Sequence, residues 1–89
     1  MEFGSTQDTR DKTLAERQID FAAMTVGFLV PGRKIARDLR KDYGEERFNM
    51  LAKCGTRVFH ITFTMRGSVT WIISARKANA REQKRYETP

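Results

Sequence analysis

Apolar and polar residues alternate with a period of two over much of the second half of the chain. Three runs show it, at residues 47–52, 58–63 and 69–74. Such alternation is typical of strands that bury one face, so it predicts a small antiparallel sheet. Cys54-Gly55 predicts a two-residue hairpin turn between the first two runs, and Met65–Gly67 predicts a three-residue loop with Gly67 in the left-handed conformation.

These two turns set the expected register, because a slip of one residue would exchange the two faces of the sheet. The expected pairs are all apolar: Met50 with Phe59, Phe48 with Ile61, Phe63 with Val69, Ile61 with Trp71, and Phe59 with Ile73. One face should therefore be hydrophobic and covered by helices. The other should be polar and cationic, and its members are Arg47, Asn49, Leu51, Val58, His60, Thr62, Thr70, Ile72 and Ser74, leading to Arg76.

Helices are expected on both sides of this β-rich region. Residues 6–17 predict a surface helix, with Ser5 or Thr6 as N-cap and a narrow buried stripe at Leu14 and Ala15. A second helix should span residues 21–29. Its N-cap is Asp20, Pro31-Gly32 end it, and its core residues are Phe21, Met24, Val26, Phe28 and Leu29. Asn79 and Glu82 form a capping box that begins a last helix at about 80–86.

Two segments admit two readings. Ile35, Leu39 and Tyr43 have helical spacing, which favours a helix at 33–43, although a strand or loop is also compatible with the pattern. Residues 1–5 read either as a strand or as a cloning-derived leader. The fold expected is α+β: one domain spanning residues 1–89, with an antiparallel sheet of three to four strands, two N-terminal helices packed on one face and a C-terminal helix.

Charge and composition narrow the function. The 89 residues carry a net charge of +6, which favours a polyanionic partner such as nucleic acid, an acidic protein or an anionic membrane surface. No run approaches the ~20 apolar residues that span a bilayer. Cys54 is the single cysteine, so neither an internal disulfide nor a cysteine-based zinc site is expected. The simplest reading is a cytoplasmic protein without a cofactor.

Residues that can bind or cleave RNA concentrate near the polar face. His60 can act as a general acid or base, although a lone strand histidine is more often an ordinary polar residue. Arg47, Arg66 and Arg76 can grip phosphate. Glu82 can act as a base, but its capping role explains it without catalysis.

Further candidates follow the last strand. Lys77, Arg81, Lys84 and Arg85 are candidate RNA-binding residues, and Tyr86 can stack on a base. Trp71 can also stack, but the register places it in the core. No metal-ligand spacing, nucleotide-binding loop or Ser/Cys nucleophile motif is present. Metal-free RNA cleavage suits this inventory, because the 2′-hydroxyl of the substrate is the nucleophile and the protein needs only to position it, move a proton and stabilise charge.

Four segments closely resemble the BrnT family of toxins of type II toxin–antitoxin systems, which are related in fold to RelE-type ribonucleases. These are Gly44–Phe48, Thr64–Gly67, Ile72–Ala78, and Arg81-Glu82 with Arg85–Glu87. The N-terminal half departs from the family pattern. Phe3–Thr6 stand where the family has a Phe-Glu-Trp-Asp-like opening strand, and Arg17-Gln18 where it has a His-Gly.

The resemblance implies an RNA endonuclease that arrests translation. It also implies a BrnA-type antitoxin as partner, in a complex that binds its own promoter DNA, and a strand-and-loop region at 33–43. Arg47, Arg66, Arg76, Lys77, Glu82 and Tyr86 lie in matching motifs, whereas His60 lies outside them. Two other classes remain open: a non-catalytic nucleic-acid-binding module, and an interaction subunit whose basic face accepts an acidic protein.

Overall fold

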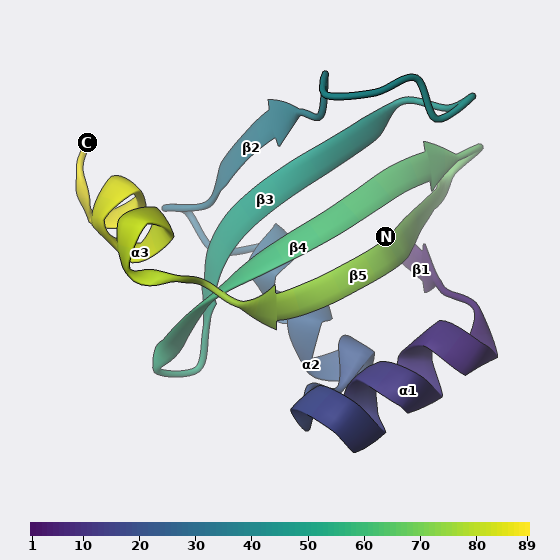
Figure 1. The fold of residues 1–89 in the computed structure, drawn as a ribbon, viewed down its shortest axis with the longest axis horizontal. Coiled ribbons are helices and arrows are strands. Elements are labelled where there is room, and N and C mark those ends of the chain that lie inside the picture. The colour runs from purple at the N-terminus through teal and green to yellow at the C-terminus, as the bar shows by residue number, and fades with distance from the viewer.

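A computed structural model describes residues 1–89 as an α+β fold with a five-stranded mixed sheet in the order β1-β5-β4-β3-β2 (Figure 1). The elements are β1 Glu2–Gly4, α1 Gln7–Arg17, α2 Phe21–Met24, the 3-10 helix η1 Thr25–Phe28, β2 Lys34–Arg37, β3 Arg47–Cys54, β4 Arg57–Arg66, β5 Val69–Lys77 and α3 Ala80–Glu87. The three predicted strands and the C-terminal helix are confirmed. The prediction of three to four antiparallel strands was wrong, because both ends of the sheet carry a further strand.

One of these extra strands is β1, which pairs in parallel with β5. The segment read as a strand or a leader is therefore part of the sheet. A Cβ at Gly4 would lie 2.6 Å from the Trp71 ring. Only glycine allows the backbone of β1 to come so close to this ring.

The other extra strand is β2, which lies in the segment 33–43. Residue spacing favoured a helix there, with a strand or loop left open; the strand-and-loop region that the family resemblance implied is confirmed. Strand β2 pairs antiparallel with β3, and Ile35 lies opposite Met50. Pairing with a fully buried neighbour overrides the weak helical spacing of this segment, because three apolar residues make only a narrow helical stripe.

The β3–β4 hairpin differs from its predicted register by two residues. Phe48 pairs with Phe63, Met50 with Ile61 and Ala52 with Phe59. Cys54 pairs with Arg57, so the turn residues are Gly55 and Thr56, and Gly55 adopts a φ of 68°. A shift by an even number preserves the faces, so the predicted faces of β3 and β4 are confirmed.

The β4–β5 hairpin departs further. Its turn is Gly67-Ser68, because Arg66 pairs with Val69. A bulge follows at Ile73, since Phe63 pairs with Ile72 but Thr62 pairs with Ser74.

Between the turn and the bulge, the observed register differs from the predicted one by an odd number of residues, so the two faces of β5 are exchanged there. Trp71 and Val69 therefore lie on the polar face, and Thr70 and Ile72, each 2% exposed, lie in the interior. The prediction that Trp71 is a core residue was wrong. Beyond the bulge the faces are restored, with Arg76 opposite His60.

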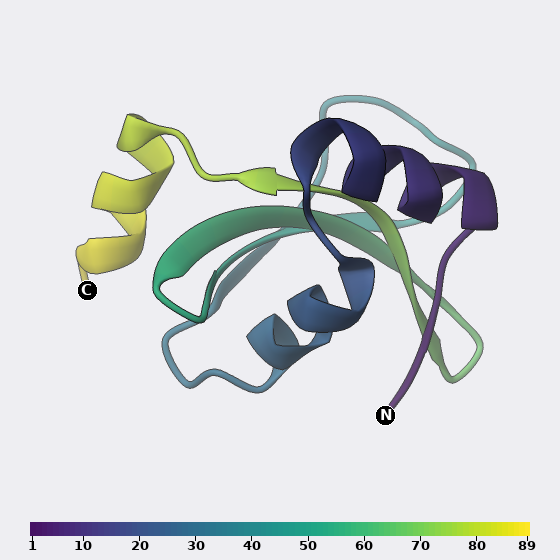
Figure 2. The same cartoon turned by 90° about the horizontal axis from the view of Figure 1, so that it is seen from below.

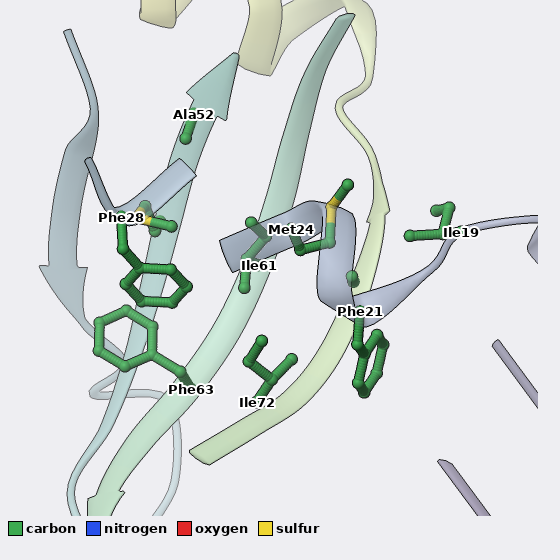
Figure 3. Packing of buried hydrophobic residues seen from close by; sticks show 10 residues of the cluster. Ile19, Phe21, Met24, Phe28, Ala52, Ile61, Phe63 and Ile72 are labelled. Atoms are coloured by element: carbon green, nitrogen blue, oxygen red, sulfur yellow. The ribbon is translucent and has the colours of Figure 1, made fainter. Parts of the chain in front are cut away.

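The core lies between one face of the sheet and α2 with η1, which pack beneath it (Figures 2 and 3). Phe28 anchors this layer, with its ring 4.9 Å from the Phe63 ring and 5.2 Å from the Phe3 ring. Asp20 caps α2 as predicted, by accepting a hydrogen bond from Ala22 N–H. Val26 and Leu29, predicted as core, are 50% and 72% exposed. The reason is that α2 tightens into a 3-10 turn, which rotates these positions outward.

Helix α1 lies along β5 and buries little (Figure 1). Its N-cap is Thr6, whose side chain accepts a hydrogen bond from Thr9 N–H. Thr13 is buried, whereas Leu14 is 50% exposed, so the predicted stripe was misplaced by one residue. Arg17 at its C-terminal end donates to the Ala75 carbonyl at 2.8 Å. None of the helices combines the length and the apolar composition that a membrane-spanning helix requires.

Helix α3 packs on the opposite face of the sheet from α2, over one end of β3 and β4. Its contact there is a small apolar cluster of Leu51, Val58 and Ala78, against which Tyr86 lies. The predicted capping box is confirmed. Asn79 accepts from Glu82 N–H at 2.9 Å, and Glu82 Oε1 accepts from Asn79 N–H at 3.0 Å. Helix α3 therefore covers one end of the polar face, and Thr62 and Thr64 in its middle are also buried.

Candidate functional site

The predicted site residues fall into two groups at opposite ends of the polar face. His60 and Arg76 lie beside α3, which carries Glu82, whereas Arg47 and Arg66 lie towards the β4–β5 turn. His60 and Arg66 are six positions apart on β4, which corresponds to about 20 Å of strand. The structure therefore does not bring all the predicted residues to one centre.

The first group is built around a cross-strand pair. His60 lies directly opposite Arg76, and the Arg76 guanidinium makes two parallel hydrogen bonds to the Glu82 carboxylate, at 2.8 and 2.9 Å. The same Glu82 oxygen that accepts from Arg76 Nη1 also accepts from the Asn79 backbone. Glu82 thus fixes the start of α3 and the orientation of Arg76 at once.

The electrostatics of this group follow from burial and neighbouring charge. The pKa of His60 is lowered from its ordinary 6.5, mainly because the imidazole is half-buried and secondly because Arg76 is positively charged. The hydrogen bonds from Arg76 lower the pKa of Glu82 to about 2 and raise the pKa of Arg76. At neutral pH the imidazole is therefore predominantly uncharged while Arg76 and Glu82 are both charged, so His60 can accept a proton next to a fixed cation.

Arg40 is a further cation that acts on this group and that the sequence did not suggest. Its charge also lowers the pKa of His60. Asp38 holds it in a bidentate pair, with Nε to Oδ1 at 2.9 Å and Nη2 to Oδ2 at 2.8 Å. Asp38 is itself buried, and these bonds keep its pKa well below its usual range. No motif signals Arg40, because it lies in a loop whose course depends on β2.

A hollow of about 310 Å³ opens beside His60 on the polar face. It lies between β2, β3, β4 and α3, and its lining residues are Lys34, Ile35, Ala36, Asn49, Leu51, His60 and Arg85. Lys34 donates through Nζ to the carbonyls of Arg85 and Thr88 at the end of α3. Lys34 and Asn49 were absent from the list of predicted site residues. Lys34 was not considered because residue spacing favoured a helix where β2 forms. Asn49 had been placed on the polar face by alternation but was not named as a site residue.

The second group is a network around the Glu45 carboxylate. Arg47 Nε lies 3.5 Å and Arg66 Nη2 3.4 Å from its two oxygens. The Arg47 guanidinium also stacks at 4.1 Å on Tyr43, and that of Arg66 at 4.5 Å on Trp71. Arg47 Nε is buried and has no hydrogen-bond partner. Two arginines share the one Glu45 carboxylate, so this network of three side chains carries a net positive charge.

The predicted RNA-binding residues that follow Arg76 do not all lie on the same face of the sheet. Lys77 lies opposite Phe59 and lines an apolar hollow beside Ile19, on the core side of the sheet and apart from the other predicted RNA-binding residues. Arg81 and Lys84 are exposed on α3, and Arg85 lines the hollow beside His60. Tyr86 is half-buried, with its hydroxyl beside Gly32, where its ring packs on the apolar cluster.

Taken together, the polar face offers a neutral imidazole, fixed guanidinium groups and a hollow lined by amide and ammonium groups. Such groups suit the binding of phosphate and the transfer of one proton. No three His, Cys, Asp or Glu side chains are gathered as a metal site would need.

Comparison with known families and proteins supports this reading at the level of the whole chain. Residues 7–82 match the family described as ribonuclease toxin, BrnT, of type II toxin–antitoxin systems. A search of curated proteins finds no match. The matched segment runs from the start of α1 to the first turn of α3 and so includes every strand except β1. The chain belongs to the BrnT family of ribonuclease toxins.

Proposed function

We propose that the chain is a metal-independent RNA endonuclease whose reaction centre is the His60 end of the polar face, acting in the cytoplasm to arrest translation. The observation that supports this is the His60–Arg76 pair with its lowered imidazole pKa, next to a hollow of about 310 Å³. His60 takes the proton of a 2′-hydroxyl, which attacks the adjacent phosphorus. The bond to the 5′-oxygen of the next nucleotide then breaks, and that oxygen takes a proton from solvent.

The arginines have electrostatic roles in this proposal. Arg76 and Arg40 stabilise the charge that develops on the phosphate oxygens. Asp38 and Glu82 fix the planes of these two guanidinium groups, so Glu82 acts through Arg76 and is a positioning residue. Arg85, Arg81 and Lys84 bind the RNA backbone on either side, and Arg47 and Arg66 hold a more distant phosphate at the Glu45 end.

The test is cleavage of a defined RNA in the presence of EDTA. We expect His60→Gln and Arg76→Lys each to lower the cleavage rate at least about 100-fold, because a positioned general base contributes roughly 10²–10⁴ and one preorganised group that stabilises developing charge roughly 10²–10³. Lys77→Ala is the matched control, since Lys77 neighbours Arg76 in sequence but lies on the other face. Cleavage that disappears in EDTA and returns with a divalent ion would contradict metal independence.

The second candidate function is binding of nucleic acid without cleavage, favoured by the net charge of +6 alone. It would show as RNA affinity that falls steeply with salt while the RNA stays intact and growth continues on expression. We also propose that the antitoxin is BrnA-like and that its complex binds promoter DNA. Co-expression of the neighbouring reading frame should then restore growth, and the purified complex should retard a promoter fragment.

A further inference from the structure

Strand β2 forms one outer edge of the sheet, and its backbone is free on that side. Asp38 N–H donates to the Arg47 carbonyl at 2.8 Å. Hydrogen-bonded and non-bonded pairs alternate along an antiparallel ladder, so Ala36 and Lys34 also bond to β3. Ile35 and Arg37 are then the non-bonded positions. Their N–H and C=O groups point away from the sheet and are available to another strand.

Side chains on this edge are exposed as well. Ile35 is 48% exposed although it lies opposite Met50, which is fully buried. Leu29 before the strand and Leu39 after it are 72% and 77% exposed. Ile35 thus supplies an exposed apolar contact on the free edge itself, and Leu29 and Leu39 are exposed in the segments that flank the strand, as in surfaces that bind an added strand.

The positive charge around β2 favours an acidic partner strand over a basic one. Arg33, Lys34 and Arg37 lie in or next to the strand, and the whole chain carries a net charge of +6. Of the three, Arg37 already faces the Glu46 carboxylate at 3.5 Å, so the excess positive charge of the edge comes from Arg33 and Lys34. A second copy that paired through the same edge would bring like charges together, which is unfavourable between strands. An acidic strand would gain from the same charges. The edge is therefore protected against self-association and complementary to an acidic partner.

We propose that the free edge of β2 binds an extended, acidic segment of the antitoxin, which extends the sheet by one strand. This inference rests on the proposed function only for the identity of the partner. Main-chain bonds to Ile35 and Arg37 supply affinity in this arrangement, and the contact with Ile35 and the excess positive charge of the edge supply specificity. Since β2 also forms one wall of the hollow beside His60, an antitoxin held on this edge lies next to the reaction centre.

The first test is amide hydrogen exchange of the complete chain, alone and with the purified product of the neighbouring reading frame. The Ile35 and Arg37 amides should exchange rapidly in the free protein and at least about 100-fold more slowly in the complex. The Ala36 amide is the internal control, because it bonds to β3 in both states. Unchanged exchange at Ile35 and Arg37 in a saturated complex would overturn the proposal.

The second test compares Arg37→Pro with Arg37→Val. Both remove the charge, but only proline removes the outward N–H, and edge strands tolerate such a proline. We expect antitoxin affinity at least about 10-fold weaker for the proline variant than for the valine variant, since it loses one hydrogen bond and interrupts the added strand. Equal affinities would count against strand addition.

Two results separate this inference from the proposed function. RNA cleavage by the free protein is measured independently of the antitoxin, so its absence counts against the endonuclease while leaving the exchange result meaningful. Protection of Ile35 and Arg37 that rises with the concentration of the free chain would show a second copy at this edge, which would overturn the assignment of its occupant.

Discussion

Replacement of Glu82 by glutamine separates two roles that this side chain combines. Glutamine keeps the length and the Oε1 atom that accepts from Asn79 N–H at 3.0 Å. It removes the negative charge that holds both Arg76 nitrogens at 2.8 and 2.9 Å. Glu82→Gln should therefore preserve the start of α3 and lose the ion pair.

The expected loss of stability is moderate. A bidentate pair is stronger than an ordinary surface pair, and Glu82 is only 11% exposed. Arg76 is 42% exposed, so water can solvate it once its partner is gone. We therefore expect about 1–2 kcal/mol, below the ~3–5 kcal/mol of a fully buried pair that loses one member. For a chain of this size each kcal/mol lowers Tm by about 4–8 °C.

The pH dependence provides the decisive measurement. The pKa of Glu82 is lowered from 4.5 to about 2 by its bonds from Arg76. A carboxyl group with a lowered pKa stabilises the fold fully above its unfolded pKa, and the contribution disappears as pH falls through the folded pKa. Urea unfolding should therefore show the full difference between wild type and Glu82→Gln at pH 6, and a much smaller one at pH 2.5.

Asn79→Ala is the matched control for this series. It removes the other half of the capping box and should cost about 1 kcal/mol. Alanine and asparagine do not titrate, so most of this difference should persist across the same pH range. If the Glu82→Gln difference were equally constant with pH, the ion pair with Arg76 would not be a source of stability.

Three further predictions concern the same surface. The rate of RNA cleavage should rise with pH through a midpoint below 6.5, because burial and Arg76 lower the pKa of His60; a midpoint above 6.5 in a pH–rate profile would contradict its role as the base. Lys34→Met should destabilise the end of α3 by about 0.5–2 kcal/mol, seen as faster amide exchange in its last turn, since Lys34 binds two terminal carbonyls. Gly4→Val should cost about 1–3 kcal/mol in urea unfolding, because its side chain would collide with the Trp71 ring; an unchanged midpoint would show that β1 does not pack there.

The sequence predicted most of the elements whose signals are local. The capping residues Asp20 and Asn79 and the alternation of β3 and β4 needed no distant contact to be recognised, and all are confirmed. At β2 the residue spacing favoured a helix, and only the family resemblance implied a strand, because the strand is determined by its neighbour in the sheet. The apolar spacing of 33–43 fits a helix in isolation, whereas pairing with the buried β3 makes the segment a strand.

The sequence predicted individual site residues, but it did not predict which of them lie together, because their grouping depends on distant contacts. The family motifs contain Arg47, Arg66 and Arg76, but they carry no information on which of these lie together. His60 was found from its strand face alone and lies opposite Arg76. Arg40 and Lys34 were missed because both depend on β2, one through the loop that follows it and the other through its contact with α3.

The bulge at Ile73 explains how one strand can serve both ends of the polar face. Trp71 and Arg76 are five residues apart, an odd number, so a regular strand would place them on opposite faces. Continuation of the register near the turn would set Arg76 opposite Phe59, on the core face. The extra residue at the bulge reverses the alternation of side chains once, so Trp71 and Arg76 lie on the same face. At one end of this face Trp71 stacks with Arg66, and at the other Arg76 lies opposite His60 and bonds to Glu82. Bulges often redirect side chains next to functional sites. Here the bulge is the feature on which the pairing of His60 with Arg76, and hence the proposed reaction centre, depends.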